Sequence, residues 1–472
     1  MVPQQLPPAP SLVPRRPQVA FARSYKEWWY CAAVLLVWLT SLAAVYIWVR
    51  NAGIQDLFEG RSSFLVSLGR ICGIVASNLL LYQVLFMARV PLFERGFGRD
   101  GITRFHRQAG FWSFWLMVAH IVFLTIAYSA MSQQNLWDEL IEMVLEFPGM
   151  LLAAAGTLLL IMVVITSMRF ARRRLRYESW HLLHLYAYLG AGLALPHQLW
   201  TGADFLVSPL ATVYWWTLWA VAAGCVLIFR VGLPIARSMH HQLRVSDVWS
   251  DGPHAITLRM TGRDLAGLKT DAGQFFVFRF LDGPGWTRGH PFSVSQAPSG
   301  NDLVITVKVV GDGTMRMRNL QPGTKVLIEG PYGVMTPQTH TRESLAMFAC
   351  GAGVAPLVSL LQAIDWKPGQ AVLVTRDHDA NDALLTSTLS DLVTTRGLQW
   401  YQLLGGRSYG PSPWVPATDP PIDGSALIEQ VVPNVRQSDV YLCGPQEWMS
   451  AVEKDLKKVG VKRKAVHCEA FA

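Results

Sequence analysis

Two apolar stretches of the chain each carry a pair of histidines at almost the same spacing. The first contains His106 and His120, fourteen positions apart, and the second contains His184 and His197, thirteen positions apart. A helix turns every 3.6 residues and rises about 1.5 Å per residue, so each pair lies near one face and spans roughly 20 Å. Two such helices side by side would present facing histidines at two depths.

The ordinary interpretation of a histidine on an apolar helix is a core or interfacial residue with one hydrogen bond. Four ionisable groups at matched spacing are different, because such groups are costly in lipid and tend to be functional. Neutral imidazole binds haem iron, and two axial histidines leave no open position at the metal. We therefore expect the four histidines to hold two bis-histidine b haems. His181 is a competing ligand one turn before His184, but the spacing to His197 favours His184.

The rest of the N-terminal half is also apolar. Mean hydropathy is +0.25 although the formal net charge is +8, and about 20 apolar residues suffice to cross a bilayer. The eighteen tryptophans are typical of membrane-interface belts. We predict an all-α six-helix transmembrane domain over residues 29–235, with spans near 29–49, 64–87, 105–128, 147–168, 179–199 and 209–230.

Basic residues give this domain an orientation. They crowd the N-terminal tail, the connection at 89–107 and the connection at 169–176. By the positive-inside rule both termini are cytoplasmic, and residues 1–28 are predicted to be a disordered cytoplasmic tail. The two histidine helices then run in the same direction. His106 and His184 share the cytoplasmic depth, and His120 and His197 share the outer depth. Since the charges flank apolar segments, they indicate topology and not nucleic-acid binding.

Arg70 lies inside the second predicted span, nearer its outer end. One interpretation is an arginine that snorkels to the outer interface. The other is a partner for the propionates of the outer haem, or an attraction for an anionic acceptor or product.

After about residue 236 the pattern becomes short apolar runs separated by Gly, Pro and Asp. Alternating runs at first predict a small antiparallel β-barrel over residues 236–338. Over residues 339–472 short apolar strands alternate with helices, which predicts an α/β Rossmann-like domain with a parallel sheet. The six cysteines show neither a CxxC motif nor a disulfide framework, as expected of a cytosolic soluble part.

Glycine-rich turns follow two of these predicted strands. Gly351, Gly353 and Pro356 lie in GAGVAP, where glycines would let backbone N–H groups approach a pyrophosphate at a helix N-terminus. The turn Cys443-Gly444-Pro445 follows a later strand. In the barrel, the segment HPFS offers an aromatic ring and a hydroxyl to a flavin, and a lysine and a Gly-rich turn farther on suit a diphosphate. These residues are His290, Pro291, Phe292, Ser293, Lys308, Gly311 and Thr314.

The motifs HPFSVSQAP, VKVVGDGTMRM, GPYG, GAGVAP and YLCGP resemble those of the ferredoxin–NADP reductase superfamily in order and spacing. Together with the four-histidine half and the segment PLFERGFGRDGITRFHRQAG, the chain resembles the ferric reductase / NADPH oxidase family. The resemblance implies FAD in the barrel at the HPFS and GDGT residues. It also implies NAD(P)H along the last domain, with its nicotinamide near Cys443. In the family a terminal aromatic covers the flavin. Here that residue is Phe471, with Glu469 as a polar neighbour and one extra alanine after it.

Two arginines are candidates for a coenzyme 2′-phosphate: Arg376 at the end of the strand AVLVTR, and Arg407 in LGGRSYG. We predict that no acidic residue ends the strand AVLVTR. The absence of an acidic residue there favours NADPH over NADH.

The sequence thus predicts a plasma-membrane relay that passes electrons from cytosolic NADPH through FAD and two b haems to an outer acceptor, without a side chain as acid or nucleophile. Phe471 would act as a gate for the nicotinamide. The acceptor is oxygen, giving superoxide, or a ferric chelate. A subunit that feeds electrons to a partner protein or quinone remains an alternative, although no partner is needed as donor. A transporter is a further alternative, since six spans alone allow it.

Overall fold

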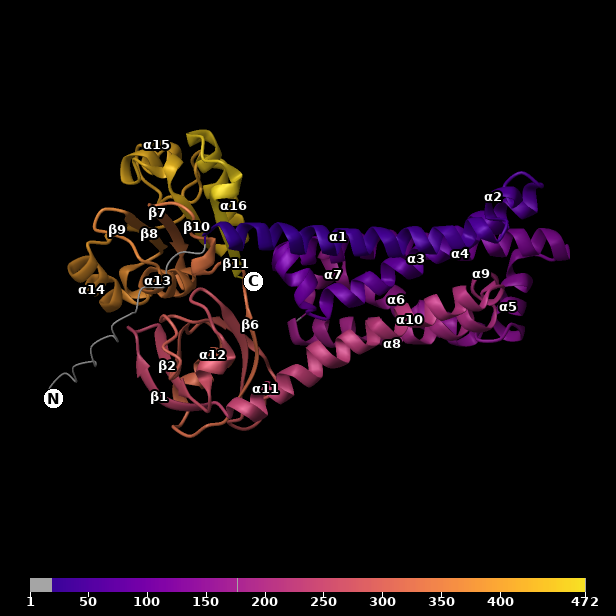
Figure 1. Cartoon of the computed structure of the whole chain (residues 1–472), viewed down its shortest axis with the longest axis horizontal. Helices are drawn as coiled ribbons and strands as arrows, with labels where there is room; N and C mark the ends of the chain where they lie inside the picture. Colours follow the sequence, from indigo (N-terminus) through magenta and orange to yellow (C-terminus); the bar gives the residue numbers. More distant parts are fainter. Residues whose placement is uncertain (1–18, 176, 472) are drawn as a thin grey trace. The chain divides into compact units, whose positions relative to one another are not determined.

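The computed structural model describes residues 19–175 and 177–471, without the side chains of residues 19–27, 95, 99, 100, 177, 178 and 471 (Figure 1). It divides into one compact unit over Trp28–Val231 and another from Gly232 onward. Residues 1–18 of the predicted tail lie outside the described residues. Helix α1 begins at Val19, so the described helix extends into the range predicted as a tail.

The first unit is built of helices. Its long helices are α1 (Val19–Arg50), α3 (Arg61–Met87), α4 (Pro91–Ser132), α6 (Met150–Ser167), α8 (Tyr177–Trp200) and α10 (Pro209–Cys225). Short helices lie in the connections: α2 (Gly53–Asp56), α5 (Leu136–Glu146), α7 (Arg169–Arg174) and α9 (Ala203–Leu206). Helix α4 is kinked at Gly98, whose φ of 67° is not helical. A π-helical segment, Val226–Gly232, continues α10 into α11 (Leu233–His241).

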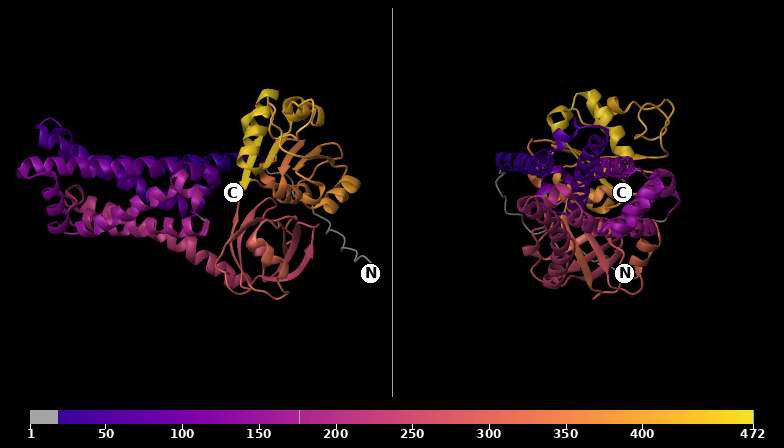
Figure 2. Two further views of the ribbon diagram at one scale, coloured as in Figure 1. Left: turned by 180° about the vertical axis from the view of Figure 1, so that it is seen from behind. Right: turned by 90° about the vertical axis from the view of Figure 1, so that its right-hand side faces the viewer.

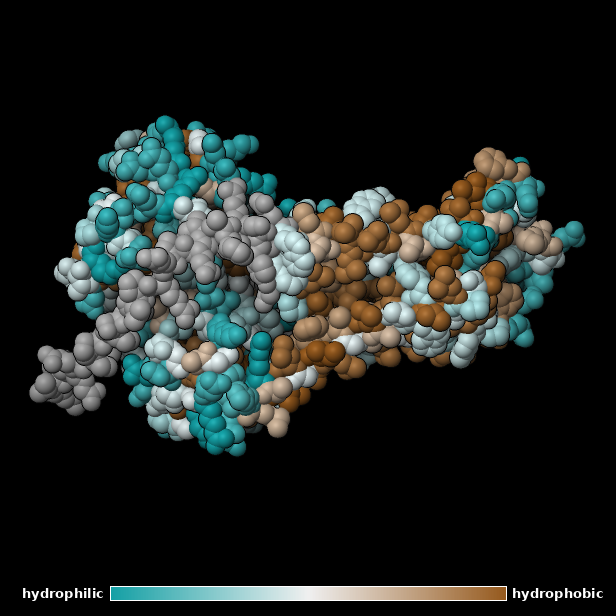
Figure 3. All heavy atoms as spheres, in the orientation of Figure 1, coloured by the Kyte–Doolittle hydropathy of each residue, from teal (hydrophilic) through white to brown (hydrophobic). Residues whose placement is uncertain are grey.

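Five helical segments in the described part of the chain are long and apolar enough to cross a membrane: Trp28–Arg50, Arg61–Met87, Gly101–Ser132, Met150–Ser167 and Pro209–His241. Most side chains of these segments are not buried within the protein, and Figure 3 shows hydrophobic residues over much of the visible surface of this unit. An apolar exposed surface of this extent suits contact with lipid. Helix α8, which carries several polar residues and Pro196, is not among the five. The sixth span stays a prediction.

Helices α6 and α8 approach closely at two glycines. A Cβ atom at Gly156 would lie 2.6 Å from the carbonyl oxygen of Gly190, and one at Gly190 would lie 3.1 Å from the carbonyl oxygen of Gly156. Small residues at such a crossing let helix backbones pack directly in a bilayer. This contact fixes α8, the helix that carries His184 and His197, against its neighbour.

The second unit begins with α11, which is followed by two three-stranded antiparallel sheets. Their orders are β1-β2-β5 and β4-β3-β6, with β1 (Arg244–Ser250), β2 (Ala255–Thr261), β3 (Phe275–Phe280), β4 (His290–Ser293), β5 (Asp302–Lys308) and β6 (Val326–Tyr332). The two sheets are joined at both edges by isolated bridges, one between Arg244 and Lys325 and one between Val294 and Ile305. The six strands therefore follow one another around a ring. Apolar residues of both sheets, Phe276 and Phe278 among them, fill its interior.

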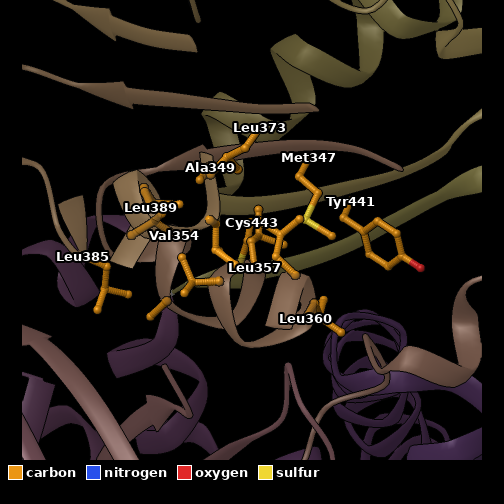
Figure 4. Packing of buried hydrophobic residues seen from close by; sticks show 14 of the residues in the cluster. Met347, Ala349, Val354, Leu357, Leu360, Leu373, Leu385, Leu389, Tyr441 and Cys443 are labelled. Carbon is orange, nitrogen blue, oxygen red and sulfur yellow. The ribbon is translucent and has the colours of Figure 1, made fainter. Parts of the chain in front are cut away.

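A parallel sheet of order β11-β10-β7-β8-β9 follows, as the second half of this unit (Figures 1 and 2). Its strands are β7 (Leu345–Cys350), β8 (Ala371–Asp377), β9 (Gln399–Leu404), β10 (Asp439–Pro445) and β11 (Val466–Phe471). Alternate residues of the strands face opposite sides. One face packs on α13 (Val354–Ala363) and α14 (Thr386–Arg396), as Figure 4 shows for part of the cluster. The other packs on α15 (Gly424–Val431) and α16 (Gln446–Val459).

The glycine crossing gives a direct test of the helical packing. We expect Gly156→Ala to lower the thermal midpoint in detergent, because overpacking against the Gly190 carbonyl costs about 1–3 kcal/mol. Gly192→Ala in α8 is the matched control, since nothing lies within 4 Å of its added Cβ. Alanine should there gain up to about 1 kcal/mol of helix propensity. Equal midpoints for the two variants would contradict the packing described.

Candidate functional site

His106 on α4 and His184 on α8 face each other. Their ring centroids lie 6.0 Å apart with the ring planes at 62°. Two imidazoles bound through nitrogen to one metal, at roughly 2 Å each, hold their centroids about 6 Å apart. Nδ1 of His184 lies 3.1 Å from the Ser167 hydroxyl, a contact that fixes the ring and that the sequence spacing did not indicate. The separation therefore fits a shared metal between the two rings.

The second pair lies farther along the same helices. The Nδ1–H of His120 donates to the carbonyl oxygen of Gly69 at 2.8 Å, which leaves the lone pair on Nε2 for a metal. A Cβ atom at Gly73 would lie 2.6 Å from His120 Nδ1, so only glycine leaves room for this ring. His197 is close enough to interact electrostatically with His120. Its Nδ1 atom is buried.

His181 lies beside Trp180, at 6.4 Å between ring centroids, and near the charge of Arg230. The ring that contacts His106 is that of His184. This arrangement favours His184 as the ligand, in agreement with the spacing argument.

Arg70 is fully engaged by protein groups. Its guanidinium donates to Asp204 at 3.0 and 2.6 Å, to Asp56 at 2.9 Å and to the carbonyl oxygen of Asn51 at 2.9 Å. The Asn51 amide in turn donates to Asp204. Arg70 therefore neither snorkels freely nor stands available to a propionate or an anionic acceptor. The two aspartates lie in connections far apart in sequence, so the sequence offered no signal for this network.

The two segments expected at the flavin come together in the barrel. His290 and Phe292 lie on one face of β4 with ring centroids 6.0 Å apart and planes within 3°. A Cβ atom at Gly313 would lie 2.9 Å from His290 Cε1, so the GDGT turn approaches this histidine. Ser293 is buried and Pro291 is exposed. A small pocket here is also lined by Phe280, Asp282, Arg288 and Arg316. Burial, followed by the charges of Arg316 and Arg288, lowers the pKa of His290, so its ring is neutral at pH 7.

The residues expected at the flavin phosphates already have partners. The Thr314 hydroxyl, in α12 (Asp312–Arg316), accepts from the N–H groups of Val310 and Gly311 at 3.0 and 3.1 Å. Lys308 Nζ lies 3.2 Å from an Asp382 carboxylate oxygen in the α/β half. A phosphate at Lys308 would have to compete with Asp382.

The two glycine-rich turns meet at the carboxyl edge of the parallel sheet. Gly351 has a φ of +54°, and Gly353 lies so close to β10 that a Cβ would be 2.0 Å from the Cys443 carbonyl oxygen. Gly444 approaches Cys350 in the same way, with 2.9 Å between the added Cβ and the Cys350 Cβ. Pro356 is buried in α13. In parallel sheets this edge is where ligands bind.

Cys443 is fully buried, and its thiol donates to the Glu469 carbonyl oxygen at 3.2 Å. Burial raises its pKa well above the ordinary value, so the thiol stays neutral and unreactive. Glu469 pairs with Cys443 between β11 and β10, and its carboxylate reaches Gly333 of the GPYG turn. The Phe471 backbone pairs with Pro445 in the same ladder, but its side chain lies outside the described residues.

The end of β8 corrects one sequence prediction. The expectation that no acidic residue closes this strand is wrong, because β9 pairs through Asp377 and makes it the last residue of β8. Arg376 is 8% exposed and donates to the carbonyl oxygens of Gly405 and Gly406, each at 2.8 Å. Arg407 is exposed and lies 3.7 Å from Glu447. Of the two arginines, the geometry therefore leaves only Arg407 accessible to a coenzyme phosphate.

Two family models match parts of this chain. Residues 72–195 match the family described as the ferric reductase like transmembrane component, and residues 252–336 match an FAD-binding domain. The first match covers His106, His120 and His184 and ends two residues before His197. Ferric reduction oxidase 7 of Arabidopsis thaliana is 23% identical over 392 residues, which cover 74% of this chain and 49% of that protein.

The ferredoxin reductase component of 3-ketosteroid-9-alpha-monooxygenase from Rhodococcus rhodochrous is 25% identical over 209 residues, which cover 42% of this chain and 55% of that protein. The chain thus spans about half the length of these curated relatives. A ferredoxin NADP+ reductase structure from Neisseria gonorrhoeae aligns with 48% of this chain and 97% of its own at 17% identity, with a TM-score of 0.39.

The two matched domains define a class: a multi-pass membrane flavoprotein of the oxidoreductases. A ferric-reductase-like transmembrane domain is followed by an FAD-binding reductase module, which is the architecture of the ferric reductase / NADPH oxidase family.

Asp377 gives this site a testable pH dependence. Burial raises its pKa from 3.8 to about 6, against the opposing charge of Lys308. The folded state therefore binds this proton more tightly than the unfolded state, and the resulting stabilisation, present below pH 4, is lost as pH rises through 6. We expect Asp377→Asn to remove this fall and to be more stable at pH 7 by about 2–3 kcal/mol, at about 1.4 kcal/mol per pKa unit.

Thermal midpoints of both proteins between about pH 4.5 and 8, on both sides of the folded-state pKa of about 6, would measure the difference. A constant gap between the two curves across this range would contradict the assignment.

Proposed function

We propose that the chain is a plasma-membrane oxidoreductase that carries electrons from cytosolic NAD(P)H, by way of FAD and two b-type haems, to an acceptor on the outer side. The observation that carries the proposal is the pair formed by His106 and His184, whose rings face each other at 6.0 Å between two helices of the apolar unit. Placing two imidazoles in lipid costs free energy, and metal binding would account for keeping the pair there.

When bound, FAD would supply the conversion of a two-electron donation into single-electron transfers, and haem iron would supply single-electron transport. The chain's own residues hold and tune these groups. His106 and His184 would hold the inner haem, and His120 and His197 the outer one. Hydrogen bonds from the Nδ1–H of His184 to the Ser167 hydroxyl and from the Nδ1–H of His120 to the Gly69 carbonyl would orient these two rings for ligation. Two histidines per metal would keep other ligands away from it.

The orientation follows from charge. We count α8 as a sixth span and place the Arg-rich connections on the cytoplasmic side. The second unit would then lie in the cytosol. There His290, Phe292 and Ser293 would bind the flavin ring and ribityl chain, and the GDGT turn its phosphates. Gly351, Gly353 and Pro356 would receive the coenzyme, and Gly444 and Pro445 its nicotinamide. Phe471 would cover the flavin and move aside for the nicotinamide.

The coenzyme choice rests on opposed features. Arg407 offers an exposed cation to a 2′-phosphate, whereas Asp377 at the end of β8 would suit the ribose hydroxyls of NADH. We favour NADPH, with NADH as the alternative.

Arg407→Ala should raise the KM for NADPH severalfold and leave the KM for NADH unchanged, because only NADPH carries the extra charge. Steady-state kinetics with both coenzymes measure this, with Arg436→Ala as a control arginine on another edge. An equal effect on both coenzymes would remove Arg407 from the site.

The acceptor is oxygen, giving superoxide, in the function we favour. Arg70 is compensated by Asp56 and Asp204, so the outer end offers an anionic ferric chelate no free cation at this position. Ferric-chelate reduction, or delivery to a partner protein or quinone, is the second candidate because of the likeness to ferric reduction oxidase 7.

Measuring superoxide formation and Fe(III) reduction with NADPH on one purified sample distinguishes these acceptors. Oxygen uptake without a signal sensitive to superoxide dismutase would count against the oxidase.

The histidine assignment has its own test. His120→Ala should lose one haem of two, while reduction of bound FAD by NADPH continues at the wild-type rate. Haem content by pyridine haemochrome and flavin bleaching in stopped flow measure the two outcomes separately. His181→Ala, which changes a histidine on the same helix as His184, should keep both haems. Retention of two haems in the His120 variant would show that the ligand set is wrong.

A further inference from the structure

Three side chains outside the cofactor motifs gather where α11 ends. One nitrogen each of His240 and His241 and one carboxylate oxygen of Asp264 lie within 4.8 Å of one another. Two imidazoles and a carboxylate are a ligand set that zinc uses with water in the fourth position. We propose that His240, His241 and Asp264 form a Zn²⁺-binding site.

His241 is oriented as a metal ligand requires. Its ring is 5% exposed, and Nδ1–H donates to the Arg263 carbonyl oxygen at 3.0 Å. The Arg263 N–H donates back to the His241 carbonyl oxygen at 2.7 Å, which ties the two segments together. With the proton on Nδ1, the neutral ring keeps its lone pair on Nε2. A hydrogen bond from the other nitrogen is the usual device that fixes the tautomer of a metal-binding histidine.

His240 and Asp264 already have the spacing of two ligands. His240 Nε2 lies 3.2 Å from Asp264 Oδ2. Two atoms bound tetrahedrally to zinc at about 2.0–2.1 Å lie roughly 3.3 Å apart. The other carboxylate oxygen, Oδ1, accepts from the Gly267 N–H at 3.1 Å, which fixes the group and leaves Oδ2 directed at His240.

The backbone holds both segments in uncommon conformations. Asp264 has a φ of 47° and Gln242, directly after His241, a φ of 45°. A non-glycine residue in this region costs on the order of 1 kcal/mol and is enriched at ligand clamps. A Cβ atom at Gly262 would lie 2.5 Å from the His241 carbonyl oxygen, so the approach of the loop to α11 depends on this glycine.

A simple surface ion pair between His240 and Asp264 would account for their contact and contribute little. It does not account for the third ligand atom within reach, the second imidazole nitrogen, which comes from the buried ring of His241. A bound Zn²⁺ would pin the last turn of α11 to the loop at 262–264. The site shares no residue with those proposed for FAD, haem or coenzyme. The zinc proposal can therefore be tested independently of the proposed function.

The test uses the full chain in detergent, without a histidine tag and after chelator treatment, titrated with Zn²⁺ by calorimetry. We expect one site per chain, weakened at least about tenfold in His240→Ala and in Asp264→Asn, as losses of metal-site groups are. Both side chains are exposed, so these variants should fold. X-ray absorption at the zinc edge should report two imidazole nitrogens. Zn²⁺ should raise the thermal midpoint of the wild type and not of Asp264→Asn.

His254→Ala and His378→Ala are the controls, since both histidines are exposed and lie outside the cluster. They should bind Zn²⁺ as the wild type does. Affinity unchanged in both cluster variants, several weak sites that no variant alters, or zinc with fewer than two imidazoles would each overturn the proposal.

Discussion

The structure of the apolar unit depends on the cost of placing an imidazole in a medium without water. Unlike leucine, a histidine in such a segment must be desolvated and must have its nitrogens satisfied. His120 meets this need through the Gly69 carbonyl, and His184 through Ser167. The nitrogens opposite those bonds remain available to a metal. Glycines at the contacts, Gly73 beside a ring and Gly156 between helices, provide the space that this arrangement requires.

The same constraint explains Arg70. A guanidinium near the end of an apolar helix is tolerated because two carboxylates and a backbone carbonyl receive its donors. The aspartates come from the α1–α3 connection and from α9, so the network ties two distant connections to α3. Removing any one carboxylate would leave a partly buried charge incompletely compensated. The network is a structural lock at this end of the helices and leaves the charge unavailable to a passing anion.

Much of this could be predicted from the sequence, because periodicity reports local structure well. The helices, the antiparallel strands and the parallel sheet follow from apolar spacing, and the histidine helices were identified from spacing alone. What failed was decided by single tertiary contacts. Pairing with β9 extends β8 by one residue, so that the strand ends at Asp377. The absence of an acidic residue at this strand end therefore no longer supports NADPH over NADH. Arg376 looked like a phosphate ligand, but the carbonyls of Gly405 and Gly406 occupy it. Neither partner is near it in sequence.

The ring of six strands is joined at its two seams by isolated bridges instead of continuous ladders. One seam is the bridge between Val294 and Ile305, beside the short strand β4 that carries His290 and Ser293. Backbone segments held by few hydrogen bonds open with less free energy than the strands within a sheet. Amide exchange should therefore be faster along this seam than within either sheet, and we expect β4 to separate from β5 while both sheets stay folded. The protein could then be loaded with its prosthetic group late in biogenesis, after the surrounding domain has matured.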